Sequence, residues 1–124
     1  MLRLAHFSDV HLTVKALGWR PRSFLSKQVT GYMNVRLLGR GARFKHSSRI
    51  VDVLRQEFKE RNYDHLVFSG DATKLAFERE FAYAAGHLGV NDPDQTPGIA
   101  VPGNHDFYTR DARDRKLFET YFHP

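Results

Sequence analysis

Three short apolar runs along the chain have the length and composition of β-strands. They cover Leu2 to Phe7, His65 to Ser69 and Gly98 to Val101. Nearly continuous apolar runs are typical of parallel strands that are covered on both faces. His6 interrupts the first run, and we expect it to be a hydrogen-bonded core histidine rather than a ligand. The residues between the runs have apolar positions at helical spacing, so the pattern predicts strands alternating with helices.

Helices are expected at residues 23–38, 49–61, 75–88 and 111–122. Gly39 and Gly41 would end the first helix, and Gly89 is placed to end the third. Ser47 and Ser48 are natural N-caps for the second helix. Its apolar face, which should pack against the sheet, is formed by Ile50, Val53, Leu54 and Phe58.

The resulting β-α-β-α-β order predicts an α/β fold with an open parallel sheet. Crossover connections between parallel strands are right-handed almost without exception, which places all the strand ends on one side. Ligands of such sheets bind at the carboxyl edge. The chain shows no internal repeat and no second domain, so we expect one domain over residues 1–124.

Each apolar run ends in a short polar motif. The motifs are Asp9-Val10-His11, Gly70-Asp71 and Gly103-Asn104-His105-Asp106. Carboxylates mixed with imidazoles suit divalent first-row metals such as Mn, Fe or Zn. Two such ions roughly 3.5–4 Å apart are a common device for displacement at phosphorus. Taken singly, Asp71 could be a turn residue and Asn104 a residue that tolerates left-handed geometry; the ordered set favours phosphoester hydrolysis.

The three motifs in this order resemble the first half of the calcineurin-like metallophosphoesterases, whose pattern is D-x-H, then G-D, then G-N-H-D or G-N-H-E. The resemblance implies a partial metallophosphoesterase-type α/β sandwich with metal ligands at the carboxyl ends of the strands. It also implies two divalent metal ions. Asp9, His11 and Asp71 would hold one ion. Asp71 would bridge to the second ion, which Asn104 would also bind.

The same resemblance implies the catalytic roles in the third motif. A hydroxide bridging the two metals would attack phosphorus. His105 would lie near the leaving oxygen, as a proton donor or as a positive charge. Asp106 would accept a hydrogen bond from the other imidazole nitrogen and keep His105 oriented.

Family members continue with a further histidine and a G-H-x-H motif, and this sequence contains no G-H-x-H. The first metal would then keep three protein ligands and the second only two. We therefore expect little or no turnover from these 124 residues alone. We also expect one face and one edge of the sheet to be uncovered, with poor solubility or self-association as the result.

Composition limits the class of protein. Hydrophobic residues make up 41% of the chain and there are ten phenylalanines, so a globular fold is expected. There is no cysteine, which excludes disulfides and thiolate zinc sites. No apolar run approaches the roughly 18–20 residues needed to span a bilayer, and no apolar signal-peptide region is visible at the N-terminus. A cytoplasmic protein is expected.

The net charge of +5 is distributed unevenly, because no acidic residue occurs between Asp9 and Asp52. The basic residues of that stretch are Lys15, Arg20, Arg22, Lys27, Arg36, Arg40, Arg43, Lys45 and Arg49. We interpret residues of about 12–46 as a basic insert, similar to one in a bacterial branch of the family. Its charge favours an anionic partner, which could be a phosphorylated substrate, nucleic acid or an anionic membrane surface with the protein peripheral to the membrane; the alternative is a solvated basic face. The helix within it could lie on a membrane surface, cover the active site or pack on its own domain.

Two function classes remain, beside a third interpretation in which these 124 residues are an incomplete gene product with no independent role. The first is a metal-dependent phosphohydrolase acting on phosphodiesters or phosphomonoesters. The alternative is a non-catalytic basic module that binds nucleic acid or anionic lipid, with affinity that falls steeply with salt and does not depend on metal.

Overall fold

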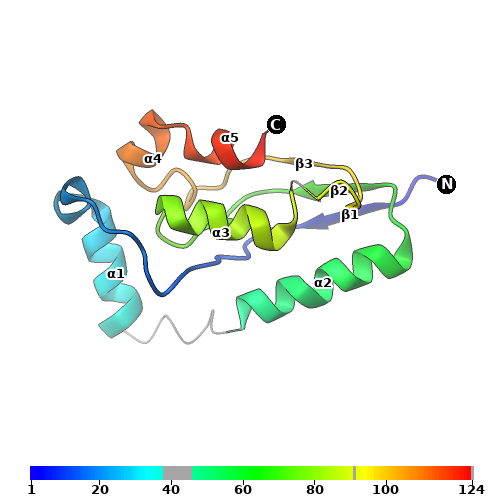
Figure 1. Ribbon diagram of the computed structural model, residues 1–124, viewed down its shortest axis with the longest axis horizontal. Coiled ribbons are helices and arrows are strands. Elements are labelled where there is room, and N and C mark those ends of the chain that lie inside the picture. The colour runs from blue at the N-terminus through cyan, green and yellow to red at the C-terminus, as the bar shows by residue number, and fades with distance from the viewer. Residues whose placement is uncertain (38–45, 91, 124) are drawn as a thin grey trace.

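The computed structural model, which describes residues 1–37, 46–90 and 92–123, contains a parallel three-stranded sheet (Figure 1). The strands are β1 (Leu4–Phe7), β2 (His65–Phe68) and β3 (Gly98–Ala100), in the spatial order β1-β2-β3. In the register, Phe7 is paired with Phe68, and Phe68 with Ala100. The predicted α/β class is therefore confirmed.

The helical elements are η1, a 3₁₀ helix (Pro21–Leu25), α1 (Lys27–Leu37), α2 (Ser47–Arg61), α3 (Glu78–Leu88), α4 (Arg110–Asp114) and α5 (Leu117–Phe122). The two segments predicted as single helices at 23–38 and 111–122 are each divided. Ser26 is extended, and its hydroxyl donates to the Ser23 carbonyl. Lys116 has a left-handed backbone between α4 and α5. The predicted end of the first helix at Gly39 and Gly41 lies outside the described residues.

The predicted helix ends are correct in one case and displaced in another. Gly89 ends α3 in a left-handed conformation with φ of 70°. The N-cap prediction for α2 is wrong, because the helix begins at Ser47 and His46 holds the cap position. The Ser48 hydroxyl instead lies 2.9 Å from the hydroxyl of Tyr83 on α3. This contact joins the two helices that flank the same part of the core.

One face of the sheet carries the hydrophobic core. Phe7 packs on Phe58 of α2, and Phe68 packs on Phe122 of α5. The α3 side chain Phe81 is fully buried in the same cluster. The predicted packing face of α2 is wrong in part: Val51 is buried, whereas Ile50 and Val53 are 56% and 59% exposed.

The opposite face of the sheet is uncovered in the part of the chain that the structure describes. His6, Val67 and Ile99 pair across the three strands on this face. His6 is exposed and bonds to the Ser69 hydroxyl at 2.7 Å, so it is hydrogen-bonded as predicted but is not a core residue. Ile99 is 59% exposed and Val101 51% exposed. The expectation from the apolar runs that both faces are covered is therefore wrong, and the expectation of one uncovered face is confirmed.

Candidate metal centre

The loops that follow β1 and β2 run side by side beyond the sheet. The backbone N–H of Asp9 donates to the carbonyl of Gly70 at 3.0 Å, and that of His11 donates to the carbonyl of Asp71 at 2.9 Å. A further bond from the Leu12 N–H to the Ala72 carbonyl, at 2.9 Å, extends the pairing. These bonds continue the parallel pairing of the strands and fix the first two motifs relative to each other.

Two glycines allow the third motif to approach the second. Gly70 has φ of +92°, and a Cβ at this position would lie 2.3 Å from the backbone nitrogen of Gly103. A Cβ on Gly103 would lie 2.1 Å from Oδ1 of Asp71. Any side chain at either position would separate the loops. The glycines of the second and third motifs therefore serve close packing of the site.

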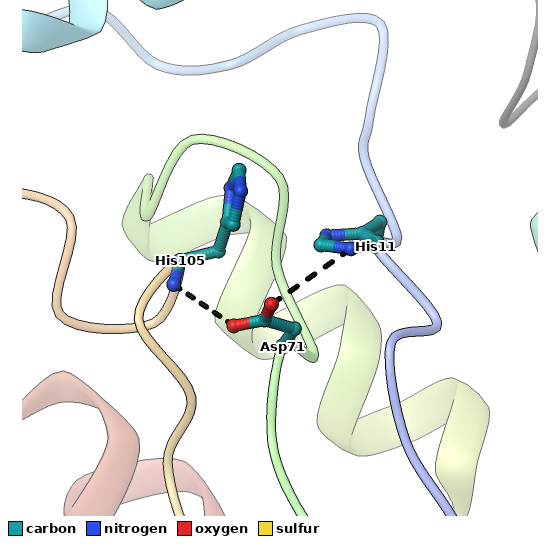
Figure 2. Close-up of side chains that lie close together, drawn as sticks. All are labelled: His11, Asp71 and His105. Carbon is teal, nitrogen blue, oxygen red and sulfur yellow. Dashed lines mark hydrogen bonds and ion pairs between the residues drawn. The ribbon is translucent and has the colours of Figure 1, made fainter.

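His11, Asp71 and His105 converge at the carboxyl edge of the sheet, with one potential ligand atom from each lying within 4.8 Å of the others. Asp71 lies between the two histidines (Figure 2). Its Oδ1 accepts from the backbone N–H of His105 at 2.9 Å, and its Oδ2 lies 3.8 Å from Nε2 of His11. The two imidazole rings meet edge to face at 4.7 Å. One carboxylate thus contacts both other motifs.

The backbone is left-handed at three of the predicted ligands. The φ angles are 57° at Asp9, 45° at His11 and 58° at Asp71. Such conformations are uncommon for residues other than glycine and occur often at functional sites. At these positions the chain turns sharply after leaving the strand, which brings side chains that follow the strand ends into one cluster.

Asp9 lies beside the cluster, and Asn104 follows Gly103 at an exposed position. Oδ1 of Asp9 is 3.8 Å from Nε2 of His11, and Ser8 donates to the other oxygen of Asp9. The Asp9 side chain is 65% exposed. Asn104 is exposed, and no hydrogen bond or ion pair of its side chain occurs among the described residues.

The predicted role of Asp106 is wrong in this geometry. The buried carboxylate of Asp106 accepts from the backbone N–H groups of Ala72, Thr73 and Gly103, at 3.2, 2.9 and 3.1 Å. It also accepts from the hydroxyl of Thr73 at 3.1 Å. Across the described chain no bond joins it to the imidazole of His105. Asp106 therefore ties the second and third motif loops together.

His105 is oriented by a backbone carbonyl. Its Nδ1 lies 2.8 Å from the carbonyl oxygen of Lys74. Because a carbonyl can only accept, Nδ1 carries the proton, and in the neutral ring Nε2 keeps its lone pair. The ring stacks on Tyr108 at 5.9 Å with an interplanar angle of 9°. The second motif loop thus performs the positioning that the sequence assigned to Asp106.

A family model described as calcineurin-like phosphoesterase matches residues 2–124. The chain belongs to the calcineurin-like phosphoesterase family. Members bind divalent metal ions, and membership indicates metal-dependent phosphoester hydrolysis. The parallel sheet with its helices agrees with a partial metallophosphoesterase fold. A search of curated proteins gives no match.

The clustered residues fit the metal chemistry of this family. His11 offers an imidazole nitrogen, and Asp71 and the adjacent Asp9 offer carboxylate oxygens, each 3.8 Å from Nε2 of His11. This mixture suits Mn, Fe or Zn better than Mg or Ca, which prefer oxygen ligands alone.

Across the described residues, no helix combines the length and apolar character needed to cross a bilayer.

Sequence reasoning missed a buried carboxyl behind the family motifs. Glu80 of α3 is fully buried and accepts from the backbone N–H groups of Leu75 and Phe77 at 2.9 and 3.2 Å. The Thr13 hydroxyl donates to its other oxygen. Burial raises the pKa of Glu80 and lowers the pKa of the buried Lys74. The sequence signal for this arrangement is a glutamate near the start of the predicted helix, which the structure places in the first turn of α3.

Proposed function

We propose that the cluster of His11, Asp71 and His105 lies in a divalent metal centre that hydrolyses phosphomonoesters or phosphodiesters. The observation that supports this most directly is the convergence of these side chains, from three loops, within 4.8 Å. A purely structural polar cluster has no need for three left-handed or glycine-dependent loops at one edge of the sheet.

In this proposal Asp9, His11 and Asp71 hold one metal ion, and Asp71 and Asn104 hold a second. The second site is the weaker, because Asp71 is shared with the first ion and Asn104 is neutral. Bound metal supplies Lewis-acid chemistry, activating water and neutralising charge on the phosphoryl oxygens. The Asp71 carboxylate, which contacts both neighbouring motifs, would offset part of the repulsion between two bound dications.

His105 supplies the proton chemistry. The Lys74 carbonyl fixes the proton on Nδ1, so Nε2 is the atom that can receive or deliver a proton at a leaving oxygen. Asp71 holds the backbone of His105, and Asp106 holds the loop. Both carboxylates therefore position the histidine without touching its ring nitrogens.

The first experiment is a titration of the metal-free protein with Mn²⁺. Binding is measured by calorimetry and by the electron paramagnetic resonance signal of the Mn²⁺ that stays free. We expect binding to the wild type and a loss of affinity of at least about tenfold in Asp71→Asn, because the charge is removed from the shared ligand. Asp94→Asn, at an exposed position on the loop before β3, is the matched control. Equal binding by all three proteins would refute the metal centre.

Turnover is the second measurement. Because the proposal assigns three protein ligands to one ion and two to the other, we expect little or no Mn²⁺-dependent hydrolysis of bis-p-nitrophenyl phosphate. Substantial hydrolysis that is lost in His105→Ala would show that these ligands suffice. It would contradict the expectation of weak activity while supporting the metal centre.

The alternative is a non-catalytic module that binds an anion through its basic surface. It is favoured by one observation: several arginine and lysine side chains line a groove close to the cluster. Such a module would bind nucleic acid or anionic lipid equally well before and after metal removal, and would lose affinity steeply with salt. An Mn²⁺ titration without binding, together with this salt response, would favour it over the hydrolase.

A further inference from the structure

A groove of about 1070 Å³ lies between the insert and the segment that follows the third motif. One wall is formed by η1 and the start of α1, and the other by α4 and its flanks. In Figure 1 these elements lie beyond the carboxyl ends of the strands, away from the sheet. The basic residues that line the groove are Arg20, Arg22, Lys27, Arg110, Arg113 and Arg115.

Part of this positive charge is used to hold the groove together. Glu78 of α3 accepts from Arg20 at 2.7 Å and from Arg115 at 2.8 Å. The hydrogen bond from Arg115 lowers the pKa of Glu78, and the positive charges of Arg115 and Arg20 lower it further, although partial burial acts in the opposite direction. One carboxylate therefore joins the residue preceding η1 to the residue that follows α4.

The remaining positive charge is not neutralised. The side chains of Arg22, Lys27, Arg110 and Arg113 are exposed, and none forms an ion pair within residues 1–37, 46–90 and 92–123. Asp111 and Asp114 also line the groove, and Asp111 lies 3.5 Å from Arg115. The lining thus keeps a positive balance in a concave space, where a field is stronger than on a flat surface.

Tyr108 places the groove beside the metal cluster. Its ring lines the groove and stacks on the imidazole of His105. Its hydroxyl donates to the carbonyl of Lys27 at 3.2 Å, which joins the two walls. Tyr108 therefore contacts both His105 and the groove. A molecule bound at the cluster can extend past Tyr108 into the positive region.

The insert wall is anchored against the protein. Gln28 is buried and donates to the carbonyls of Leu75 and Ala76, both at 3.3 Å. A Cβ on Gly31 would lie 2.7 Å from Leu75 and 3.1 Å from the Tyr108 hydroxyl. The groove wall formed by η1 and the start of α1 is consequently held in place before an anion binds.

We propose that this groove binds a phosphate group of the substrate other than the one that is hydrolysed. The inference rests on the proposed hydrolase function and deepens it. The substrate class is then a molecule with at least two phosphate groups, one at the His105 edge of the cluster and one between Arg22 and Arg113. Guanidinium groups are suited to this because they bind phosphate oxygens in pairs.

The second phosphate can belong to a soluble molecule or to a lipid headgroup, since the recognition chemistry is the same. Leu25 at the groove rim is 95% exposed, and the adjacent Phe24 is 63% exposed. Apolar side chains beside basic ones are typical of surfaces that contact the headgroup region of a membrane. Experiments with a soluble probe and a lipid probe separate the two sources.

The soluble probe is inorganic tripolyphosphate, titrated by calorimetry into protein stripped of metal on a chelating resin. We expect binding that weakens with salt, and a loss of at least about tenfold in affinity in the Arg22→Gln/Arg113→Gln double variant. The matched control is Arg49→Gln/Lys59→Gln, which removes the same charge from exposed positions on α2. Melting temperatures of all three proteins show whether each variant is folded.

The lipid probe is a phosphatidylcholine vesicle, prepared with or without phosphatidic acid, and binding is measured as the protein that sediments with the vesicles. Binding only to the vesicles with phosphatidic acid, lost in the groove variant and in Leu25→Ser, would identify a lipid phosphate as the source. Tripolyphosphate binding without vesicle binding would identify a soluble one. Binding of neither probe, or equal loss in the α2 control, would overturn the proposal. Because metal is absent, this failure is separate from failure of the Mn²⁺ titration, which tests the hydrolase.

Discussion

Gly103 lies against the carboxylate of Asp71, so closely that a Cβ on the glycine would lie 2.1 Å from Oδ1. That same oxygen accepts a hydrogen bond from the backbone N–H of His105 at 2.9 Å. The contact therefore couples the second motif to the third at the centre of the cluster. Gly103 contributes no metal ligand itself, but its missing side chain leaves room for the Asp71 carboxylate.

Replacing Gly103 by alanine should disrupt the metal centre. The added methyl would push the Asp71 carboxylate away from His105 and His11, which breaks the three-residue cluster. We expect at least about a tenfold loss of Mn²⁺ affinity, comparable to removing an outer partner of a metal ligand. Calorimetric titration with Mn²⁺ measures this directly.

Gly86→Ala is the control, because a Cβ there meets nothing within 4 Å. Gly86 lies inside α3, where alanine is favoured over glycine by about 0.5–1 kcal/mol. We expect higher stability in urea and unchanged Mn²⁺ affinity. If Gly103→Ala bound Mn²⁺ as tightly as this control, the packing argument for Asp71 would be wrong.

Asp106→Asn should lower the free energy of unfolding. The buried carboxylate accepts four hydrogen bonds. In the asparagine variant an NH₂ group replaces one of the two oxygens, and because NH₂ can only donate, it cannot pair with the N–H and O–H donors that face it. We expect a loss of about 1–3 kcal/mol in the free energy of unfolding, measured by urea denaturation. Exposed Asp114→Asn should change it little. A variant that is fully stable yet has altered His105 titration in NMR would restore the orienting role predicted from sequence.

Glu80 should make stability depend on pH in an unusual direction. Burial raises its pKa above 4.5, so the folded state binds more protons than the unfolded state between 4.5 and the folded value. Its contribution to stability is present below 4.5 and is lost as pH rises through the folded pKa. Glu80→Gln cannot titrate and should lack this slope. Urea denaturation of both proteins from about pH 4 to about pH 8 tests it; parallel profiles would count against a raised pKa.

The uncovered sheet face should cause association between molecules. Ile99 and Val101 are more than half exposed on the face that carries His6. Exposed apolar patches of this kind promote self-association. Ile99→Thr keeps a β-branched residue and should lower concentration-dependent light scattering. Val53→Thr on α2, with the same 59% exposure, is the control. Equal effects of both substitutions would show that the sheet face is not responsible.

The candidate site could be predicted largely from sequence because its residues follow strand ends. Parallel strands joined by right-handed crossovers bring their carboxyl ends to one edge, whatever packs elsewhere. His11, Asp71 and His105 therefore meet as the motif order predicts. The position of Asn104 relative to the proposed second metal stays a prediction. Gly89 was equally predictable, because a helix end that needs positive φ is a local property.

Tertiary structure alone decided which polar groups pair with which. Nothing local to Asp106 shows that its partners include Ala72 and Thr73, because those contacts depend on how closely two loops pack. The helical spacing likewise predicted Ile50 to lie on the buried face of α2, although this side chain is 56% exposed. Apolar periodicity reports which residues share a side of an element. Which side is covered depends on neighbours distant in sequence, and that is settled only when the whole chain has packed.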